Sequence, residues 1–67
     1  DILNINLGMK LLEKDVKSIS IYDLKGTEIF HSDTFKSSID IKKFNRGSYI
    51  IKVKVSNSSI TKRFFVN

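Results

Sequence analysis

The sequence contains no Cys, Pro, Trp or Ala. Without Cys, the chain can form neither a disulfide framework nor a Cys-ligated metal site. No run of about 18 apolar residues is present, so we expect no transmembrane segment. The N-terminal residues lack the basic and apolar regions of a signal peptide, and any signal for crossing an inner membrane would lie outside this chain. Because the chain begins with Asp1 and enters a strand pattern at once, we expect it to be a piece of a longer protein.

The residues that are present favour β-structure. Ten Ile and four Val stand among the 67 residues, and β-branched side chains pack well on the pleated surface of a sheet. A chain of this length is one domain at most, with a modest core, and we therefore treat residues 1–67 as a single domain. Turn signals recur about every 8–12 residues, a spacing typical of a sandwich or small barrel.

Alternation of apolar and polar residues between these turn signals predicts the individual strands. We expect strands at residues 2–7, 16–23, 27–31, 38–41, 48–55 and 59–66. Residues 9–15 fit a loop with a short extended piece. Residues 23–26 predict a tight turn, because Asp23 can accept hydrogen bonds from nearby backbone N–H groups and Gly26 tolerates unusual dihedral angles. The last two strands are expected to carry the greatest share of the core.

The net charge of +5, from ten Lys and two Arg against seven carboxylates, indicates attraction to anionic partners. Nucleic acid and a lipopolysaccharide-rich surface are two such partners. The lysines, however, are scattered and alternate with apolar residues, a pattern more typical of a solvated face that guards the edges of a sheet. No motif interleaves aromatic and basic residues as RNA-binding sheets do, so we expect no nucleic-acid partner.

Catalytic and metal-binding patterns are missing from the sequence. The single histidine, His31, stands beside Ser32 and Asp33 at the end of a predicted strand. A catalytic triad needs a nucleophile and an acid that converge on the histidine from separate segments, whereas neighbouring strand residues point to opposite faces. We therefore predict a surface histidine and no enzyme. The carboxylates show no calcium-loop spacing, and we expect no metal and no cofactor.

Three stretches, taken in order, are similar to a known family. They read ISIYDLKG at residues 19–26, IDIKKFNRGSYIIKV at residues 39–53 and TKRFFV at residues 61–66. Their order and spacing resemble the type A C-terminal sorting domain of the Bacteroidetes type IX secretion system, also called the Por secretion system. Two features depart from that family. The Tyr-Pro-Asn-Pro segment that usually precedes the first strand is missing, and residues 42–44 read Lys-Lys-Phe where the family has Ser-x-Leu.

The resemblance implies a fold, a function and a set of partners. The fold would be an immunoglobulin-like antiparallel β-sandwich of about six to seven short strands. Residues 1–67 would form one C-terminal sorting domain that directs an upstream cargo to the cell surface or medium. The partners would be the type IX outer-membrane translocon, a shuttle protein and a sortase-like peptidase that normally removes the domain. The protein would pass through the periplasm to the outer membrane.

Eight residues of the matching stretches are candidates for recognition by the translocon. They are Gly26, Gly47, Tyr49, Lys62, Arg63, Phe64, Phe65 and Val66. A structural role competes with docking for several of them. The glycines supply positive φ angles or a close approach of the backbone. A buried Tyr usually finds a hydrogen-bond partner, and we expect Tyr49 to be a core aromatic whose hydroxyl reaches the rim.

The last strand combines basic and aromatic candidates. Lys62 and Arg63 fit either a charged edge that discourages aggregation or a contact with an acidic surface of the translocon. Residues 64–66 cannot all face one side of a strand. One of the two aromatic residues should therefore be partly exposed, and an exposed apolar residue is a candidate docking contact.

A carbohydrate- or adhesin-type binding module is the main competing interpretation. Such modules present two or three exposed aromatic residues on one face of a sheet. In this chain Tyr22, Phe30 and Phe35 would have to form that platform, since no Trp is present. The structure can test this directly, because the platform requires all three rings on one exposed face.

Overall fold

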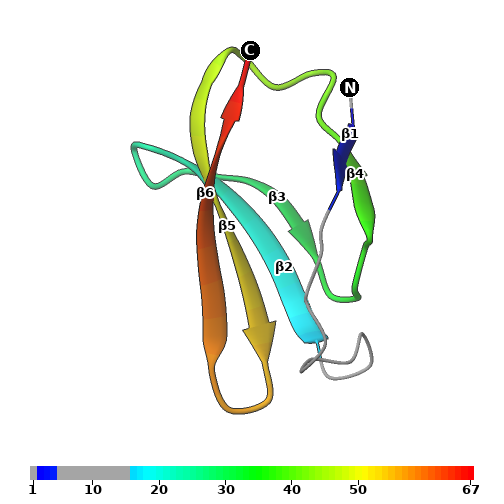
Figure 1. Cartoon of the computed structure of the whole chain (residues 1–67). Helices are drawn as coiled ribbons and strands as arrows, with labels where there is room; N and C mark the ends of the chain where they lie inside the picture. Colours follow the sequence, from blue (N-terminus) through cyan, green and yellow to red (C-terminus); the bar gives the residue numbers. More distant parts are fainter. Residues whose placement is uncertain (1, 5–15) are drawn as a thin grey trace.

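The structure, a computed structural model, describes residues 2–4 and 16–67. In this part of the chain all regular structure is β-strand and no residue is helical (Figure 1). The strands are β1 (Ile2–Asn4), β2 (Val16–Asp23), β3 (Glu28–Ser32), β4 (Ser38–Asp40), β5 (Gly47–Val55) and β6 (Ser59–Val66). No helix long and apolar enough to cross a membrane occurs among these residues.

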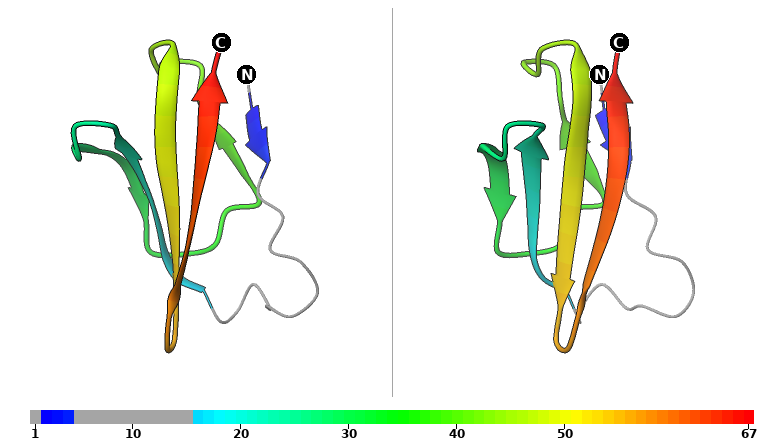
Figure 2. Two further views of the ribbon diagram at one scale, coloured as in Figure 1. Left: turned by 60° about the vertical axis from the view of Figure 1, so that its left-hand side comes forward. Right: turned by 90° about the vertical axis from the view of Figure 1, so that its left-hand side faces the viewer.

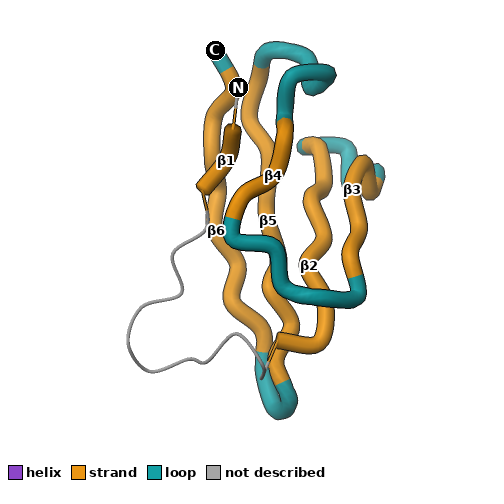
Figure 3. The backbone as a smooth tube through the Cα atoms, turned by 90° about the vertical axis from the view of Figure 1, so that its right-hand side faces the viewer, coloured by secondary structure: helices purple, strands orange, loops and turns teal. Residues whose placement is uncertain are grey.

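The strands form two antiparallel sheets. The larger sheet has four strands in the order β3-β2-β5-β6, and the smaller pairs β1 with β4. Two views agree that the smaller sheet lies over one face of the larger one, with β1 beside β6 (Figures 2 and 3). The predicted all-β antiparallel sandwich is therefore confirmed.

The core lies between the two sheets because apolar residues alternate along the strands of the larger one. In β5, the residues at positions 49, 51, 53 and 55 are buried, while Lys52 and Lys54 between them are exposed. Antiparallel register places Ile19 and Ile21 of β2 opposite Val53 and Ile51, on the same face. Both β2 side chains are completely buried. The smaller sheet covers this face, and its Ile39 packs into the same cluster.

The strand predictions hold closely within the described residues. The bounds of β2 and β6 match residues 16–23 and 59–66, and β5 begins one residue earlier than predicted. β4 ends one residue earlier than predicted, although Ile41 beyond it is buried in the core. The strand expected at residues 2–7 is seen at Ile2–Asn4. Its remaining residues and the loop expected at residues 9–15 lie outside the described residues.

β3 begins at Glu28 rather than at residue 27, because the preceding turn is longer than predicted. The carboxylate of Asp23 accepts hydrogen bonds from the backbone N–H groups of Lys25 and Thr27, both at 2.9 Å. The backbone N–H of Asp23 donates to the carbonyl oxygen of Thr27, which closes the turn on that residue. The predicted turning role of Asp23 is confirmed, and Thr27 belongs to the turn.

Candidate functional site

The predicted recognition residues gather on the β5–β6 hairpin. Seven of the eight lie on it, and Gly26 alone lies elsewhere, in the turn between β2 and β3. β6 forms one edge of the four-stranded sheet, and the chain ends beside the start of β1 (Figure 2). The matching stretch at residues 61–66 is therefore a strand of the folded sheet.

The two glycines are required by backbone conformation. Gly26 has a φ of 88° and Gly47 a φ of 145°, both in a region that residues with a Cβ rarely adopt. A Cβ built at either position would meet no atom within 4 Å. The positive-φ interpretation is therefore confirmed and the close-approach interpretation is wrong. Neither glycine presents a side chain to a partner, so any docking role would act through the shape of the two turns.

Tyr49 is a core residue with a tethered hydroxyl, as predicted. Its side chain is 6% exposed, and its ring packs between those of Phe44 and Phe64, with centroid distances of 5.2 and 5.7 Å. Its hydroxyl donates a 2.6 Å hydrogen bond to the backbone carbonyl oxygen of Asn45. This bond fastens the loop between β4 and β5 to the core. A docking partner could reach little of this side chain.

Tyr49→Phe removes the hydrogen bond and leaves the ring stacking in place. We expect it to lower the free energy of unfolding by about 1 kcal/mol, the typical value for a partly buried hydrogen bond. For a domain of this size the thermal midpoint should fall by about 4–8 °C, measured by circular dichroism. Tyr22→Phe is the matched control, because Tyr22 makes no side-chain hydrogen bond within the described residues. A Tyr49→Phe midpoint equal to that of Tyr22→Phe would contradict this role.

β6 divides the C-terminal stretch between two faces. Phe64 lies opposite Tyr49 and Val66 opposite Gly47, on the side that faces the core. Phe65 lies opposite Ser48 on the other side and is 59% exposed. The expectation of one exposed aromatic residue is confirmed. Phe65 also lines a hollow of about 300 Å³ near β1, together with Ile2, Ile41, Val66 and Asn67.

The two basic candidates of β6 lie on opposite faces. Lys62 pairs with Ile51 on the core-facing side, yet it is exposed. Arg63 pairs with Ile50 on the outer face of the four-stranded sheet. The two side chains therefore cannot act as one contact, although they are neighbours in the sequence. Edge protection and docking remain separate interpretations for Lys62 and Arg63.

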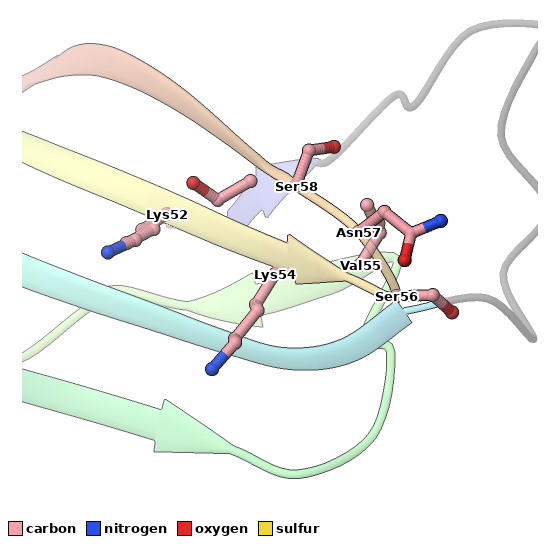
Figure 4. Close-up of a pocket in the computed structure, with 7 residues that line it drawn as sticks. Lys52, Lys54, Val55, Ser56, Asn57 and Ser58 are labelled. Atoms are coloured by element: carbon pink, nitrogen blue, oxygen red, sulfur yellow. The ribbon is translucent and has the colours of Figure 1, made fainter.

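Two basic residues that the sequence did not single out lie on the same outer face as Arg63. Lys52 and Lys54 of β5 alternate with the buried residues of that strand and are exposed. They border a hollow of about 340 Å³ at the end of the hairpin, which is completed by Val55, Ser56, Asn57, Ser58 and Ser59 (Figure 4). Two ammonium groups near several hydroxyls and an amide form a surface suited to anionic groups.

His31 lies between a serine and an acid, but the serine is Ser20 and not its neighbour Ser32. Ser20 Oγ lies 2.9 Å from His31 Nδ1, and Asp33 Oδ1 lies 2.7 Å from His31 Nε2. Asp33 lies in the bend just after β3, and Ser20 lies directly across from His31 on β2. Cross-strand register was the signal needed to find this cluster.

The same cluster has the geometry of a structural tether. Ser20 is only 7% exposed, so it offers little access to a substrate, whereas a nucleophile must reach the reacting carbon. The hydrogen bond between Ser20 and His31 instead joins the edge strand β3 to its neighbour β2. His31 itself is exposed, as predicted. No group of three metal-ligating side chains occurs in the described part of the chain.

The aromatic platform of a carbohydrate-binding module does not form. Tyr22 lies on the outer face of β2, whereas Phe30 pairs with Ile21 on the core-facing side. Phe35 packs against the core from the connection that follows β3. The three rings therefore share no exposed face, and the competing interpretation loses its structural basis.

Comparison with known proteins gave one result. A family model described as "Secretion system C-terminal sorting domain" matches residues 1–67. No curated protein and no solved structure matches the chain.

Proposed function

Because the chain belongs to the family of secretion system C-terminal sorting domains, we propose that the outer-membrane translocon of a type IX system recognises it in folded form. As a type IX C-terminal sorting signal, the domain marks its protein for export across the outer membrane to the surface or medium. Its family is one of sorting domains and not of enzymes.

One observation carries the proposal of recognition in folded form. The C-terminal stretch that resembles the family is an integral strand, β6, with Phe64 packed against the core and Val66 buried in it. An extended tail could present all of its residues to a receptor, but here Phe64 and Val66 are committed to the fold. The residues left for recognition are those that β6 and its neighbours turn outward.

The later steps of the pathway are part of the same proposal. After passage through the periplasm, a shuttle protein would receive the domain at the outer membrane, and a sortase-like peptidase would remove it from the cargo. Support for both steps comes from the family to which residues 1–67 belong. The domain itself would supply binding surface and no catalytic group.

A fusion assay in a bacterium with a type IX system tests the proposal. A fluorescent protein with an inner-membrane signal peptide would carry residues 1–67 and a linker at its C-terminus. We expect fluorescence at the surface or in the medium. The same fusion without these residues, or in a strain that lacks the translocon, should remain in the periplasm. Cargo that stays in the periplasm although the attached domain is folded and protease-resistant would refute the proposal.

A further inference from the structure

The distribution of charge along the chain is uneven. Residues 41–67 contain seven basic residues and no Asp or Glu. The basic residues are Lys42, Lys43, Arg46, Lys52, Lys54, Lys62 and Arg63. The β5–β6 hairpin therefore carries only positive side-chain charge, which the overall net charge does not reveal.

The carboxylates of residues 23, 28, 33 and 40 contact turn N–H groups or His31 rather than lysine or arginine side chains. Asp23 and Asp40 accept hydrogen bonds from backbone N–H groups of the turns that follow them. Asp33 lies 2.7 Å and Glu28 3.6 Å from nitrogens of His31. Within residues 2–4 and 16–67, no Lys or Arg nitrogen lies within 4.0 Å of a carboxylate oxygen. The cations of the hairpin thus form no direct ion pair with these acids, although Glu28 stands on the same face of the sheet, opposite Tyr22.

Strand register gathers part of this charge on the outer face of the sheet. Lys52 and Lys54 lie on one side of β5, opposite Thr61 and Ser59 of β6. Arg63 lies in the next row, opposite Ile50. Three cations thus occupy successive rows of one exposed surface, and only hydroxyl-bearing residues face the two lysines from β6.

Protection of a sheet edge does not explain this arrangement. Charged residues guard a sheet when they stand on an edge strand. β5 is an internal strand, flanked by β2 and β6, so Lys52 and Lys54 are not edge residues. Like charges that stand close together on one face repel each other and favour neither strand pairing nor packing. The two lysines stand on the solvated face of the sheet, where a partner can reach them.

Apolar side chains stand beside the cations on the same outer face. Tyr22 lies beside Ile50 on the outer face, and both are half-buried. Phe65 lies one row beyond Arg63 and is the most exposed aromatic residue among those described. An aromatic anchor bordered by Arg and Lys is a common composition of protein–protein interfaces.

We propose that this outer face binds an acidic segment of a protein of the secretion machinery. We call it the basic-aromatic face, and it consists of Tyr22, Ile50, Lys52, Lys54, Arg63 and Phe65. The three cations pair with Asp or Glu side chains of the partner, and the ring of Phe65 contacts an apolar residue beside them. The inference rests on the proposed function and assigns recognition to a sheet face rather than to the chain end. The headgroup of a phosphorylated glycolipid would satisfy the cations, but it would leave the exposed ring of Phe65 without an apolar partner.

A binding titration with two probes tests the assignment. Residues 1–67 fused to a fluorescent protein are titrated with the detergent-solubilised outer-membrane shuttle protein of a type IX system, and separately with vesicles that contain lipopolysaccharide. The triple variant Lys52→Gln, Lys54→Gln, Arg63→Gln should bind the shuttle protein at least about tenfold more weakly. The control triple Lys25→Gln, Lys36→Gln, Lys43→Gln removes the same charge from exposed residues outside this face, and it should bind within about twofold of wild type.

Two further measurements do not depend on the stability of the triple variant. Affinity of the wild-type fusion for the shuttle protein should fall as the salt concentration rises, because dissolved ions screen exposed pairs between the cations and the partner's carboxylates. Phe65→Ala should weaken binding several-fold with an unchanged thermal midpoint, since this side chain is largely exposed. Both results together support a mixed basic and aromatic contact.

The outcomes separate this inference from the proposed function. Equal binding by the two triple variants, or affinity independent of salt, overturns the basic-aromatic face while export in the fusion assay still supports a sorting signal. Charge-dependent binding to the lipopolysaccharide vesicles without binding to the shuttle protein also overturns it, in favour of a glycolipid. Failure of the wild-type fusion both to bind and to be exported overturns the proposed function and the inference with it.

Discussion

Deletion of residues 64–67 is expected to abolish export of an attached cargo and to unfold much of the domain. The deletion removes Phe64, whose ring stacks on Tyr49, and Val66, which is buried in the core. Loss of a single large core side chain typically costs about 2–5 kcal/mol. A domain of this size has a total stability of only about 3–10 kcal/mol. Circular dichroism and the export assay on the same fusion would measure both effects.

Phe65→Ala is the matched control for this deletion. It alters the same stretch of β6 but removes a side chain that lies outside the core, so the domain should remain folded. If the deletion unfolds the domain and Phe65→Ala leaves it folded, the main role of β6 is to complete the fold. A deleted domain that still folds and still exports its cargo would count heavily against the sorting function.

Ile21→Ala is expected to be among the most destabilising alanine substitutions in the described residues. Ile21 is completely buried in β2, between Phe30 of β3 and Ile51 of β5. Removing most of this side chain leaves a cavity at the centre of the sheet and should cost about 3 kcal/mol. At about 4–8 °C per kcal/mol, the thermal midpoint should fall by roughly 12–24 °C. Thermal and urea unfolding would provide the measurement.

Ile29→Ala tests whether burial, and not residue type, sets this cost. Ile29 belongs to β3 but is exposed, at the irregularity in the pairing with β2. Its replacement should cost less than about 1 kcal/mol. Similar losses from both substitutions would mean that β2 does not occupy the centre of the core.

The sequence was most informative where one face of a strand is buried and the other is solvated. Alternation at residues 48–55 and 59–66 located β5 and β6 to within one residue, because most core positions there are followed by a polar residue. The start of β3 was misplaced because hydrogen bonds to Asp23 extend the turn to Thr27. The four-residue turn motif at residues 23–26 does not show that Thr27 also belongs to the turn.

The candidate surfaces were harder to predict because they depend on register between strands. Lys52, Lys54 and Arg63 look scattered along the chain, and only the pairing of β5 with β6 brings them onto adjacent rows. The contact between Ser20 and His31 likewise joins residues eleven positions apart. Alternation shows which residues share a face of one strand, but it cannot show which residues of the next strand stand beside them.

The strand order of the four-stranded sheet also bears on when the domain can form during synthesis and transport. β2 and β3 are neighbours in sequence and in space, but the other edge of β2 is completed only by β5, and β5 in turn by β6. A polypeptide that emerges N-terminus first can close the β2–β3 hairpin early, yet half of the sheet arrives with its last residues. A chain that stops before β5 would lack two of the four strands of this sheet. Assembly of this sheet is therefore set by its two C-terminal strands, which have to pair before β2 gains its second neighbour.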